Sequence, residues 1–375
     1  MKYLSKTILC IFLAAVLCWF LPWLYALMTP APSNDPFYGF SPVSGEWVNG
    51  REMRDKALRD SLLPQIYYRD LLAKDRLQDS LNGKAMSAHS FKTHEIFFVN
   101  SPRDVVKRLP AVWLMMESMP DGVDLEDPRE IFRFTEDGRM EFVDIASNTV
   151  NPARTRRFTE TLRARGFSFP AINLSANITS RKAYDEGYLM VDSEGKVFHV
   201  KQQGGRPYVA AVNLPDSVKA SRVFIWEEMD RSLLGMAIDT ANRPWLIQRD
   251  GYQAIPFPEG ITVDPTREAI MVMGNLFNLT CRFTSQDGAR WYALDADTYK
   301  LLGSLDYRRP RTAASEIADY IFPFTLSFTS SYDSLAYPRI GRFSAKALPL
   351  WIAVAAVCLI IGYRRKSLKK RNNHV

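Results

Sequence analysis

The sequence has few of the side chains on which cross-linking and catalysis usually depend. Its 375 residues include four cysteines and four histidines. Cys10, Cys18 and Cys358 fall in long apolar runs, so Cys281 is alone in the region between those runs. A disulfide within this region is therefore excluded, and an ordinary hydrophobic core must hold it together.

Motifs of common active sites are also missing. The sequence contains no HExxH, GxSxG, GxGxxG or Walker phosphate loop. His89, His94 and His199 are not spaced as metal ligands on one helix face, and Cys281 has no evident histidine partner as a nucleophile. We therefore expect a protein that is not an enzyme and that carries no cofactor.

One acidic cluster is the best candidate for a metal site. It consists of Asp121, Asp124, Glu126 and Asp127, with Glu130 close behind. Carboxylates suit a hard cation such as Ca²⁺, but the spacing is not that of an EF-hand loop. A solvated loop between strands is the favoured interpretation, and no metal is expected.

Two apolar runs mark the ends of the chain. Residues 7–28 carry no charge and reach the roughly 20 residues that a membrane-spanning helix needs, while residues 347–363 are at the short end of that range. A cleaved signal peptide is the alternative for the first run, although this run is longer than the apolar core of about 7–15 residues that signal peptides usually have. A buried core helix is the alternative for the second.

Cations beside the two runs predict their orientation. Two lie before the first run and six follow the second, which places both termini in the cytoplasm by the positive-inside rule. When these eight cations are left out, the 48 basic and 41 acidic residues of the chain become 40 and 41, so the region between the two apolar runs is nearly neutral. The basic pI then reflects membrane orientation and not nucleic-acid binding. These residues are Lys2, Lys6, Arg364, Arg365, Lys366, Lys369, Lys370 and Arg371.

The region between the runs starts with helical periodicity. Residues 52–81 repeat apolar side chains every three or four positions, which predicts helices. Pro64 is expected to divide them, and Asn82-Gly83 to end the second. Residues 313–320 predict a short helix near the other end.

Strand patterns dominate from residue 91 onward. An apolar strand, a turn with Asp and Gly or Asn, and a second strand recur at residues 131–143, 188–200, 234–247 and 282–294. The turns at Gly138, Gly195, Asn242 and Gly288 are 57, 47 and 46 residues apart. A period near 40–50 residues predicts a mainly β, propeller-like domain with four to five blades, and a β-sandwich or irregular meanders are the alternatives. Asn151 and Pro152 begin a helix predicted to end at Gly166, inserted between two blades.

The predicted organisation follows from these segments. It comprises a cytoplasmic N-terminus (1–6), a first transmembrane helix (7–28), a linker with membrane-proximal helices (29–90), the propeller-like domain (91–310), a return segment (311–346), a second transmembrane helix (347–363) and a basic cytoplasmic tail (364–375).

Four segments carry a resemblance to a known family. Residues 112–119 (VWLMMESM), 157–162 (RFTETL), 166–171 (GFSFPA) and 184–188 (YDEGY) resemble a domain of unknown function in two-span membrane proteins of Bacteroidota, often encoded beside ABC-transporter genes. The resemblance implies the bacterial inner membrane, with residues 29–346 in the periplasm, and ABC-transporter subunits as partners besides membrane lipid. No catalytic residue comes with it.

The favoured function is therefore a non-enzymatic membrane protein that presents a periplasmic β-domain to a partner or ligand, as an accessory of an ABC-type transport system. A periplasmic hydrolase with carboxylates at the mouth of a propeller channel is one alternative. A sensor that acts through a membrane partner is the other, because the cytoplasmic tail is too short to be an output domain. The sequence leaves the ligand and the oligomeric state open.

Overall fold

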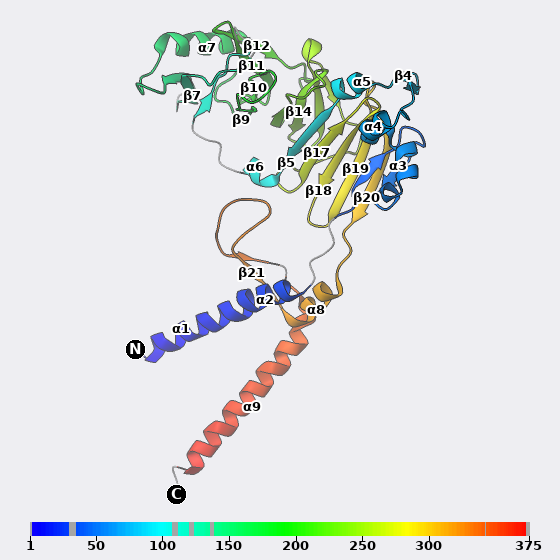
Figure 1. The fold of residues 1–375 in the computed structure, drawn as a ribbon. Coiled ribbons are helices and arrows are strands. Elements are labelled where there is room, and N and C mark those ends of the chain that lie inside the picture. Colours follow the sequence, from blue (N-terminus) through cyan, green and yellow to red (C-terminus); the bar gives the residue numbers. More distant parts are fainter. Residues whose placement is uncertain are drawn as a thin grey trace. The chain divides into compact units, whose positions relative to one another are not determined.

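The computed structural model describes residues 2–29, 35–106, 112–119, 124–135, 139–341 and 343–372. The chain divides into two compact units (Figure 1). We call residues 1–35 together with 308–375 the terminal unit, and residues 36–307 the central unit. Both ends of the sequence belong to the terminal unit, so the central unit is one continuous segment.

The first predicted span is helical throughout its described length. Helix α1 (Lys2–Ala15) continues through a π-helical turn (Val16–Phe20) into α2 (Leu21–Met28). Pro22 explains the turn, because it has no N–H to offer the carbonyl one turn earlier. The N–H of Leu21 instead bonds to the carbonyl of Val16, five residues back.

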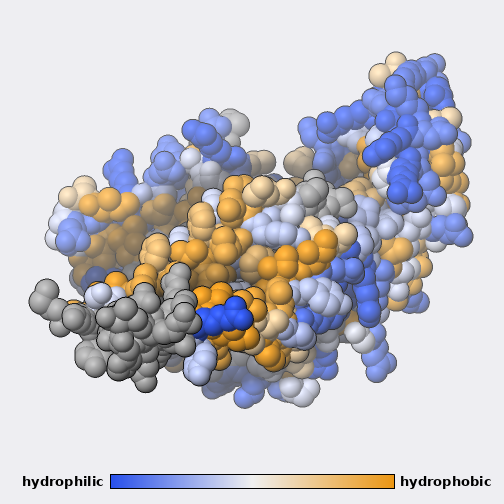
Figure 2. All heavy atoms as spheres, turned by 90° about the horizontal axis from the view of Figure 1, so that it is seen from below, coloured by the Kyte–Doolittle hydropathy of each residue, from blue (hydrophilic) through white to orange (hydrophobic). Residues whose placement is uncertain are grey.

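Helix α9 (Leu348–Asn372) covers the second predicted span. Within the described part of the chain, the stretch 345–364 is the one helix long and apolar enough to cross a membrane, and Val16–Met28 is a shorter apolar helix. Large apolar side chains are exposed on both, among them Trp23, Ile352 and Leu359. Figure 2 shows hydrophobic residues in orange gathered on the face that it presents. Placement of either helix in a membrane stays a prediction.

Helix α8 (Ala313–Ile321) confirms the short helix predicted at 313–320 and connects both apolar helices of the terminal unit. The Tyr25 hydroxyl donates to the carbonyl of Ala314 at 3.0 Å, and the Trp351 indole donates to that of Ile321 at 2.7 Å. A small hairpin, β21 (Leu326–Ser327) with β22 (Arg339–Ile340), and a 3₁₀ turn (Ala345–Ala347) complete this unit.

The central unit begins with short strands and helices. Strands β1 (Tyr38–Phe40) and β2 (Trp47–Asn49) pair and are followed by a 3₁₀ turn (Glu52–Arg54), α3 (Lys56–Leu62) and α4 (Pro64–Ala73). The predicted break at Pro64 is confirmed, because proline is the first residue of α4. Asp55 caps α3 by accepting two of its free N–H groups.

The predicted end of the second helix at Asn82-Gly83 is wrong. Helix α4 ends at Ala73, nine positions before Asn82. The chain that follows forms β3 (Ser80–Leu81) and β4 (Lys84–Ala85). Asn82 and Gly83 are the two turn residues between these strands, with φ of 50° and 77°. Positive φ at both positions is typical of a type I′ hairpin, which outweighed the weak helical periodicity. Helix α5 (Ala88–Thr93) follows.

Four antiparallel sheets form most of the central unit, and each takes consecutive strands in order, except that the fourth also includes β5 from earlier in the sequence. Strand β5 (Ile96–Asn100) joins the fourth sheet beside β17, and helix α6 (Pro102–Val106) follows it. The first sheet contains β6 (Trp113–Leu114), β7 (Glu130–Phe134) and β8 (Met140–Asp144), and the second contains β9 (Asn173–Ser175), β10 (Tyr188–Val191), β11 (Val197–Gln203) and β12 (Arg206–Ala211). The third contains β13 (Ala220–Ile225), β14 (Leu233–Asp239), β15 (Pro244–Gln248) and β16 (Ala254–Pro256), with a 3₁₀ turn at Asp250–Tyr252, and the fourth contains β17 (Ala269–Gly274), β18 (Asn278–Thr284), β19 (Gly288–Asp295) and β20 (Leu301–Arg308).

The four predicted hairpins are confirmed, one in each successive sheet. They are β7–β8, β10–β11, β14–β15 and β18–β19. Two of their turns are held by the same hydrogen bonds. Asp192 Oδ1 accepts the N–H groups of Glu194 and Lys196. Asp239 Oδ1 likewise accepts those of Ala241 and Arg243. The repeat read from the sequence is therefore a structural repeat.

Core clusters lie between consecutive sheets. One joins the first sheet to the second, another the second to the third, and the largest the third to the fourth. This packing of consecutive antiparallel sheets of three to five strands is propeller-like. No sheet closes on itself, and within the described ranges no comparable core cluster joins the fourth sheet to the first.

Helix α7 (Pro152–Ala164) is inserted between the first two sheets, as predicted. The Asn151 side chain accepts the N–H of Arg154 and so caps its start, and Gly166 follows its end with φ of 83°. Phe158 and Leu162 are fully buried on its inner face. The capping residues place the helix and these two residues fix it to the sheets.

Candidate functional site

Each of the four sheets has one strand that contributes to a shared cavity: β6, β9, β13 and, in the fourth sheet, β5. We call these the inner strands and the cavity, of about 670 Å³, the central cavity. Strand β9 and the start of the following loop line one wall, and β13 lines the next. Trp113 of β6, Tyr188 of β10, Thr266 and the segment from Asn100 to α6 contribute most of the remainder. Apolar and polar side chains both line it, which is usual for sites that bind organic molecules.

Side chains from β9 attach this wall to β13. Asn173 Oδ1 accepts the N–H of Val223 at 2.9 Å, and Ser175 Oγ accepts that of Ile225 at 3.0 Å. These bonds satisfy backbone donors on the free edge of β13. The two inner strands are thereby held side by side although they belong to different sheets.

Two charged residues line the central cavity. Arg222 makes a hydrogen bond of 3.3 Å to the carbonyl of Ser221, and Asp104 accepts the hydroxyl of Ser101 at 2.7 Å. Asp104 is the one carboxylate among the described lining residues. The guanidinium group of Arg222 is therefore the natural contact for an anionic group in this cavity.

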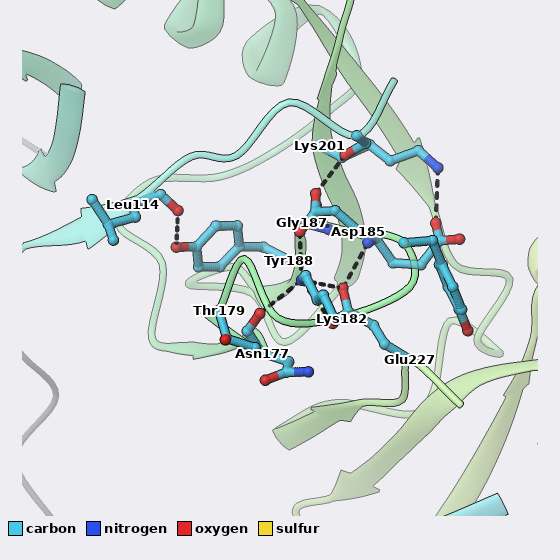
Figure 3. A network of polar contacts seen from close by, with 12 residues as sticks. Leu114, Asn177, Thr179, Lys182, Asp185, Gly187, Tyr188, Lys201 and Glu227 are labelled. Atoms are coloured by element: carbon cyan, nitrogen blue, oxygen red, sulfur yellow. Dashed lines mark hydrogen bonds and ion pairs between the residues drawn. The ribbon is translucent and has the colours of Figure 1, made fainter. Parts of the chain in front are cut away.

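Tyr188 connects the central cavity to a second feature. Its hydroxyl donates to the carbonyl of Leu114 at 2.6 Å, and burial raises the pKa of this phenol. Figure 3 shows the ring of Tyr188 pointing toward Leu114, beside a group of charged side chains. We call that group the charge cluster; its members are Lys182, Asp185, Glu186, His199, Lys201, Glu227 and Arg249.

Lys182 is the centre of one half of the charge cluster. Its ammonium group lies 2.6 Å from Asp185 Oδ1 and 2.7 Å from both carboxylate oxygens of Glu227 (Figure 3). It also donates to the carbonyl of Asn177 at 2.7 Å. The side chain of Lys182 is 6% exposed and that of Glu227 is 1% exposed, so these charges are paired away from water. Ala176 and Ile178, on either side of Asn177, line the central cavity.

Glu186 is the centre of the other half. Its carboxylate contacts Lys201 Nζ at 2.8 Å and also pairs with Arg249. The N–H of Glu186 donates to Glu227 at 2.7 Å, which joins the two halves. Three cations therefore balance three carboxylates, as buried charges require.

His199 completes this half as a neutral ring. Its Nε2 lies 2.6 Å from the carbonyl oxygen of Glu186, which can only accept, so Nε2 carries the proton. Its Nδ1 accepts the hydroxyl of Tyr252 at 2.9 Å, and Tyr252 in turn accepts that of Tyr208. Burial, and then the charge of Lys201, lower the pKa of His199 to about 3.

The pKa of Glu227 moves in the opposite direction. Burial raises it to about 7, although hydrogen bonding and charge from Lys182 act to lower it. Both of its oxygens are occupied by Lys182 and one also by the N–H of Glu186. The carboxylates of Asp185 and Glu186 also have partners on both oxygens. The charge cluster can therefore hold the loop beside the central cavity in one conformation.

The four segments that carry the family resemblance meet at this place. Ser118 of the first donates to Asp185 of the last at 2.6 Å. Met115, Phe158, Leu162, Phe167 and Tyr188, drawn from all four segments, belong to one core cluster. The segments are thus parts of one structural unit between the first and second sheets.

Gly187 explains why this motif contains glycine. It has φ of 64°, and a Cβ atom there would lie 2.5 Å from the carbonyl oxygen of Val200. Sequence reasoning singled out the motif only for its resemblance and missed Lys182, Glu186 and Glu227 as a group. The Asp-Glu-Gly run was the available signal, but its partners are distant in the sequence.

The predicted metal candidates do not form a described site. Asp124, Glu126 and Asp127 are exposed, and Asp121 lies outside the described residues. In the described part of the chain, no group of three or more His, Cys, Asp or Glu side chains is placed to hold a metal ion.

The remaining candidates are widely separated. His89 is exposed, and His94 Nδ1 contacts the carbonyl of Ser90. Cys281 is buried in the core, which raises the pKa of its thiol. Lys2 and Lys6 lie in α1, and the six C-terminal cations lie in α9.

Comparison with known proteins identifies a family and weaker structural likenesses. The family described as domain of unknown function (DUF4857) matches residues 46–294, more than half of the chain. No curated protein sequence matches. The match bears on the family alone, so the Bacteroidota setting, the two spans and the transporter partner stay predictions.

Among solved structures, the chain is similar to the Dos1 propeller (12% identity, TM-score 0.30, 48% of this chain and 45% of that chain). It is also similar to the β-propeller domain of Cps50 (Swd1) from Myceliophteria thermophila (16%, 0.28, 59% and 60%) and to apo AztD from Citrobacter koseri (10%, 0.28, 53% and 48%). The chain thus spans less than two thirds of each of these structures. At such low TM-scores the likenesses carry no argument about function.

Proposed function

This chain belongs to the family described as domain of unknown function (DUF4857), and on that premise we propose that it is a membrane-anchored binding protein without catalytic activity. The central unit presents the central cavity to a ligand or to a segment of a partner protein, and the terminal unit anchors it in the membrane. The observation that carries the proposal is the cavity of about 670 Å³ formed by the inner strands of four sheets.

The composition of the cavity favours an organic anion with an apolar body. Trp113, Ile178 and Phe224 supply apolar contact, and Arg222 supplies a cation, which donates a hydrogen bond to the carbonyl of Ser221 in its own strand. Pockets of this size and mixed lining are usual for small-molecule sites. The charge cluster supports this use because a cavity whose wall is held in place loses less entropy on binding.

The anchor is proposed from the exposed apolar helices. Between residues 348 and 364, the described side chains of α9 other than the half-buried Trp351 are exposed, and a helix that is apolar all round is unfavourable in water. The cations at the start of α1 and the end of α9 favour cytoplasmic termini, which would put the central unit in the periplasm of a bacterial inner membrane. An ABC-type transport system remains the proposed setting, from the family resemblance.

The hydrolase alternative has less support in this cavity. Two carboxylates with separated pKa values would be the expected signature. Asp104 is the single carboxylate among the described lining residues, while the carboxylates of the charge cluster are buried and paired. We therefore retain binding without catalysis as the proposal.

A pull-down in mild detergent tests the proposed setting. Tagged full-length protein is compared with a variant lacking residues 347–375, and we expect transporter subunits to co-purify with the first and not with the second. Recovery of the full-length protein alone, in repeated preparations, would count against a transporter partner.

Substitution in the cavity tests the proposed binding surface. Arg222→Ala should weaken capture of the partner, whereas Arg206→Ala, an exposed arginine on the outer strand β12, should not. Equal capture by the two variants would remove the central cavity from the proposal.

A further inference from the structure

A second cavity lies in a different part of the central unit, away from the residues of the proposed function. Its volume is about 360 Å³, and it is enclosed by α4, α5, β1 and the edge of the fourth sheet at β5, β17 and β18. Figure 1 shows α4 and α5 beside that sheet. It shares no lining residue with the central cavity.

One polar side chain in this second cavity is buried with an unused acceptor. Gln65 is 5% exposed, and its Nε2 donates to the carbonyl of Phe40 at 3.0 Å. This bond fixes the orientation of the amide, because the reversed amide would place oxygen against oxygen. Gln65 Oε1 is buried and has no hydrogen-bond partner within the described residues. A buried acceptor without a donor is unfavourable, so Gln65 Oε1 needs a donor from a water molecule or from a ligand group.

The other buried polar groups of the cavity satisfy one another. Thr280 Oγ1 and Asn275 Nδ2 both donate to Asn278 Oδ1 at 3.1 Å. Gln65 Oε1 is therefore the group left to recognise a donor. Arg69 and Glu95 also line the cavity, both exposed and of opposite charge, so they do not select for an ionic ligand.

Aromatic rings form much of the remaining wall. Tyr68 and Phe91 stack with ring centroids 4.6 Å apart, and Phe97 is 58% exposed on the edge strand β5. Rings of this kind offer flat surfaces to a planar ligand. The aromatic lining residues are Phe37, Phe40, Tyr68, Phe91 and Phe97.

We infer that the second cavity binds a small, neutral aromatic molecule whose N–H or O–H group donates to Gln65 Oε1. The ring lies among the aromatic side chains, and the single donor reaches the unused acceptor. This site is independent of the membrane placement and of the central cavity, so its test can succeed or fail separately from that of the proposed function.

Indole and N-methylindole are suitable probes, because methylation of the ring nitrogen removes the donor, and the Gln65→Met variant below separates this loss from the added bulk of the methyl group. Binding of each to the full-length protein in detergent is measured by calorimetry or by ligand-observed NMR. We expect indole to bind about fivefold more tightly, the value of one hydrogen bond between neutral groups. Equal affinities, or no binding of indole at millimolar concentration, would overturn the inference and leave the acceptor to a water molecule.

Variants locate the binding. Gln65→Met keeps the volume and removes the acceptor, so it should abolish the preference for indole. Phe97→Ala removes an exposed aromatic wall and should weaken both probes, while Val99→Ala is its matched control on the same strand, 56% exposed and outside the cavity. If Gln65→Met does not fold, the Phe97 and Val99 pair still decides the location: equal effects of these two substitutions contradict the site.

Discussion

The ammonium group of Lys182 lies 2.7 Å from both carboxylate oxygens of Glu227, although 45 residues separate them. Lys182 belongs to the loop between β9 and β10 of the second sheet, and Glu227 follows β13 in the third. The contact therefore joins two neighbouring sheets through one buried ion pair. It also holds the loop whose residues Ala176 and Ile178 line the central cavity.

Removal of this cation should destabilise the central unit strongly. Lys182→Met leaves the carboxylates of Asp185 and Glu227 buried without their cation, and breaking a buried pair in this way costs about 3–5 kcal/mol. Chemical denaturation of the full-length protein in detergent measures the loss. Lys196→Met is the control, because its pair with Glu194 is on the surface and its loss should leave the transition unchanged. Equal transitions for the two variants would show that the buried pair contributes nothing.

Glu227 and His199 should give stability two opposing dependences on pH. The folded pKa of Glu227, about 7, is above its ordinary value of 4.5, so its contribution to stability is lost as pH rises from 4.5 to 7. The folded pKa of His199, about 3, is below its ordinary 6.5, so its contribution is lost as pH falls from 6.5 to 3. The two slopes, each about 1.4 kcal/mol per pH unit, cancel between pH 4.5 and 6.5.

Single substitutions separate these two slopes. Relative to wild type, the free energy of unfolding of Glu227→Gln should rise with pH between 4.5 and 6.5, and that of His199→Gln should fall over the same window. Denaturation curves at fixed pH values measure both differences. If the free energy of unfolding of a variant differs from that of wild type by the same amount at every pH, the shifted pKa assigned to the substituted residue is contradicted.

Gly187 should tolerate alanine worse than a neighbouring glycine of similar conformation. Gly187 and Gly204 have φ of 64° and 57°, so alanine at either position meets the left-handed penalty of about 1–2 kcal/mol. A Cβ atom at Gly187 would also lie 2.5 Å from the carbonyl oxygen of Val200, whereas nothing lies within 4 Å at Gly204. Thermal unfolding should therefore begin at a lower temperature for Gly187→Ala than for Gly204→Ala, and the reverse order would refute the close approach.

Reporter fusions test the proposed orientation of the ends. A fluorescent protein that folds only in the cytoplasm should be active when fused after residue 375, and alkaline phosphatase at the same position should be inactive. Replacement of the six cations from Arg364 to Arg371 by glutamine should increase the phosphatase signal, because the positive-inside rule acts through them. Phosphatase activity in the unaltered fusion would place the C-terminus outside.

Local signals in the sequence predicted local structure well. Asn151, Pro152 and Gly166 bound α7, and Pro64 begins α4, because caps and prolines act within one turn of the chain. The four hairpins were predictable for the same reason. The Asn82-Gly83 pair was misread, since the same two residues suit a helix end and a type I′ turn, and only the pairing of β3 with β4 distinguishes them.

The amino-acid sequence by itself determined the mainly β character, the repeated hairpins, the inserted helix and the two apolar ends. These follow from periodicity and from residues a few positions apart. Only the tertiary structure decided that Lys182, Glu186 and Glu227 form one balanced cluster, and that Gln65 is left with an unused acceptor. Both depend on side chains from different sheets or helices meeting away from water, where each charge or polar atom needs a partner that no local pattern specifies.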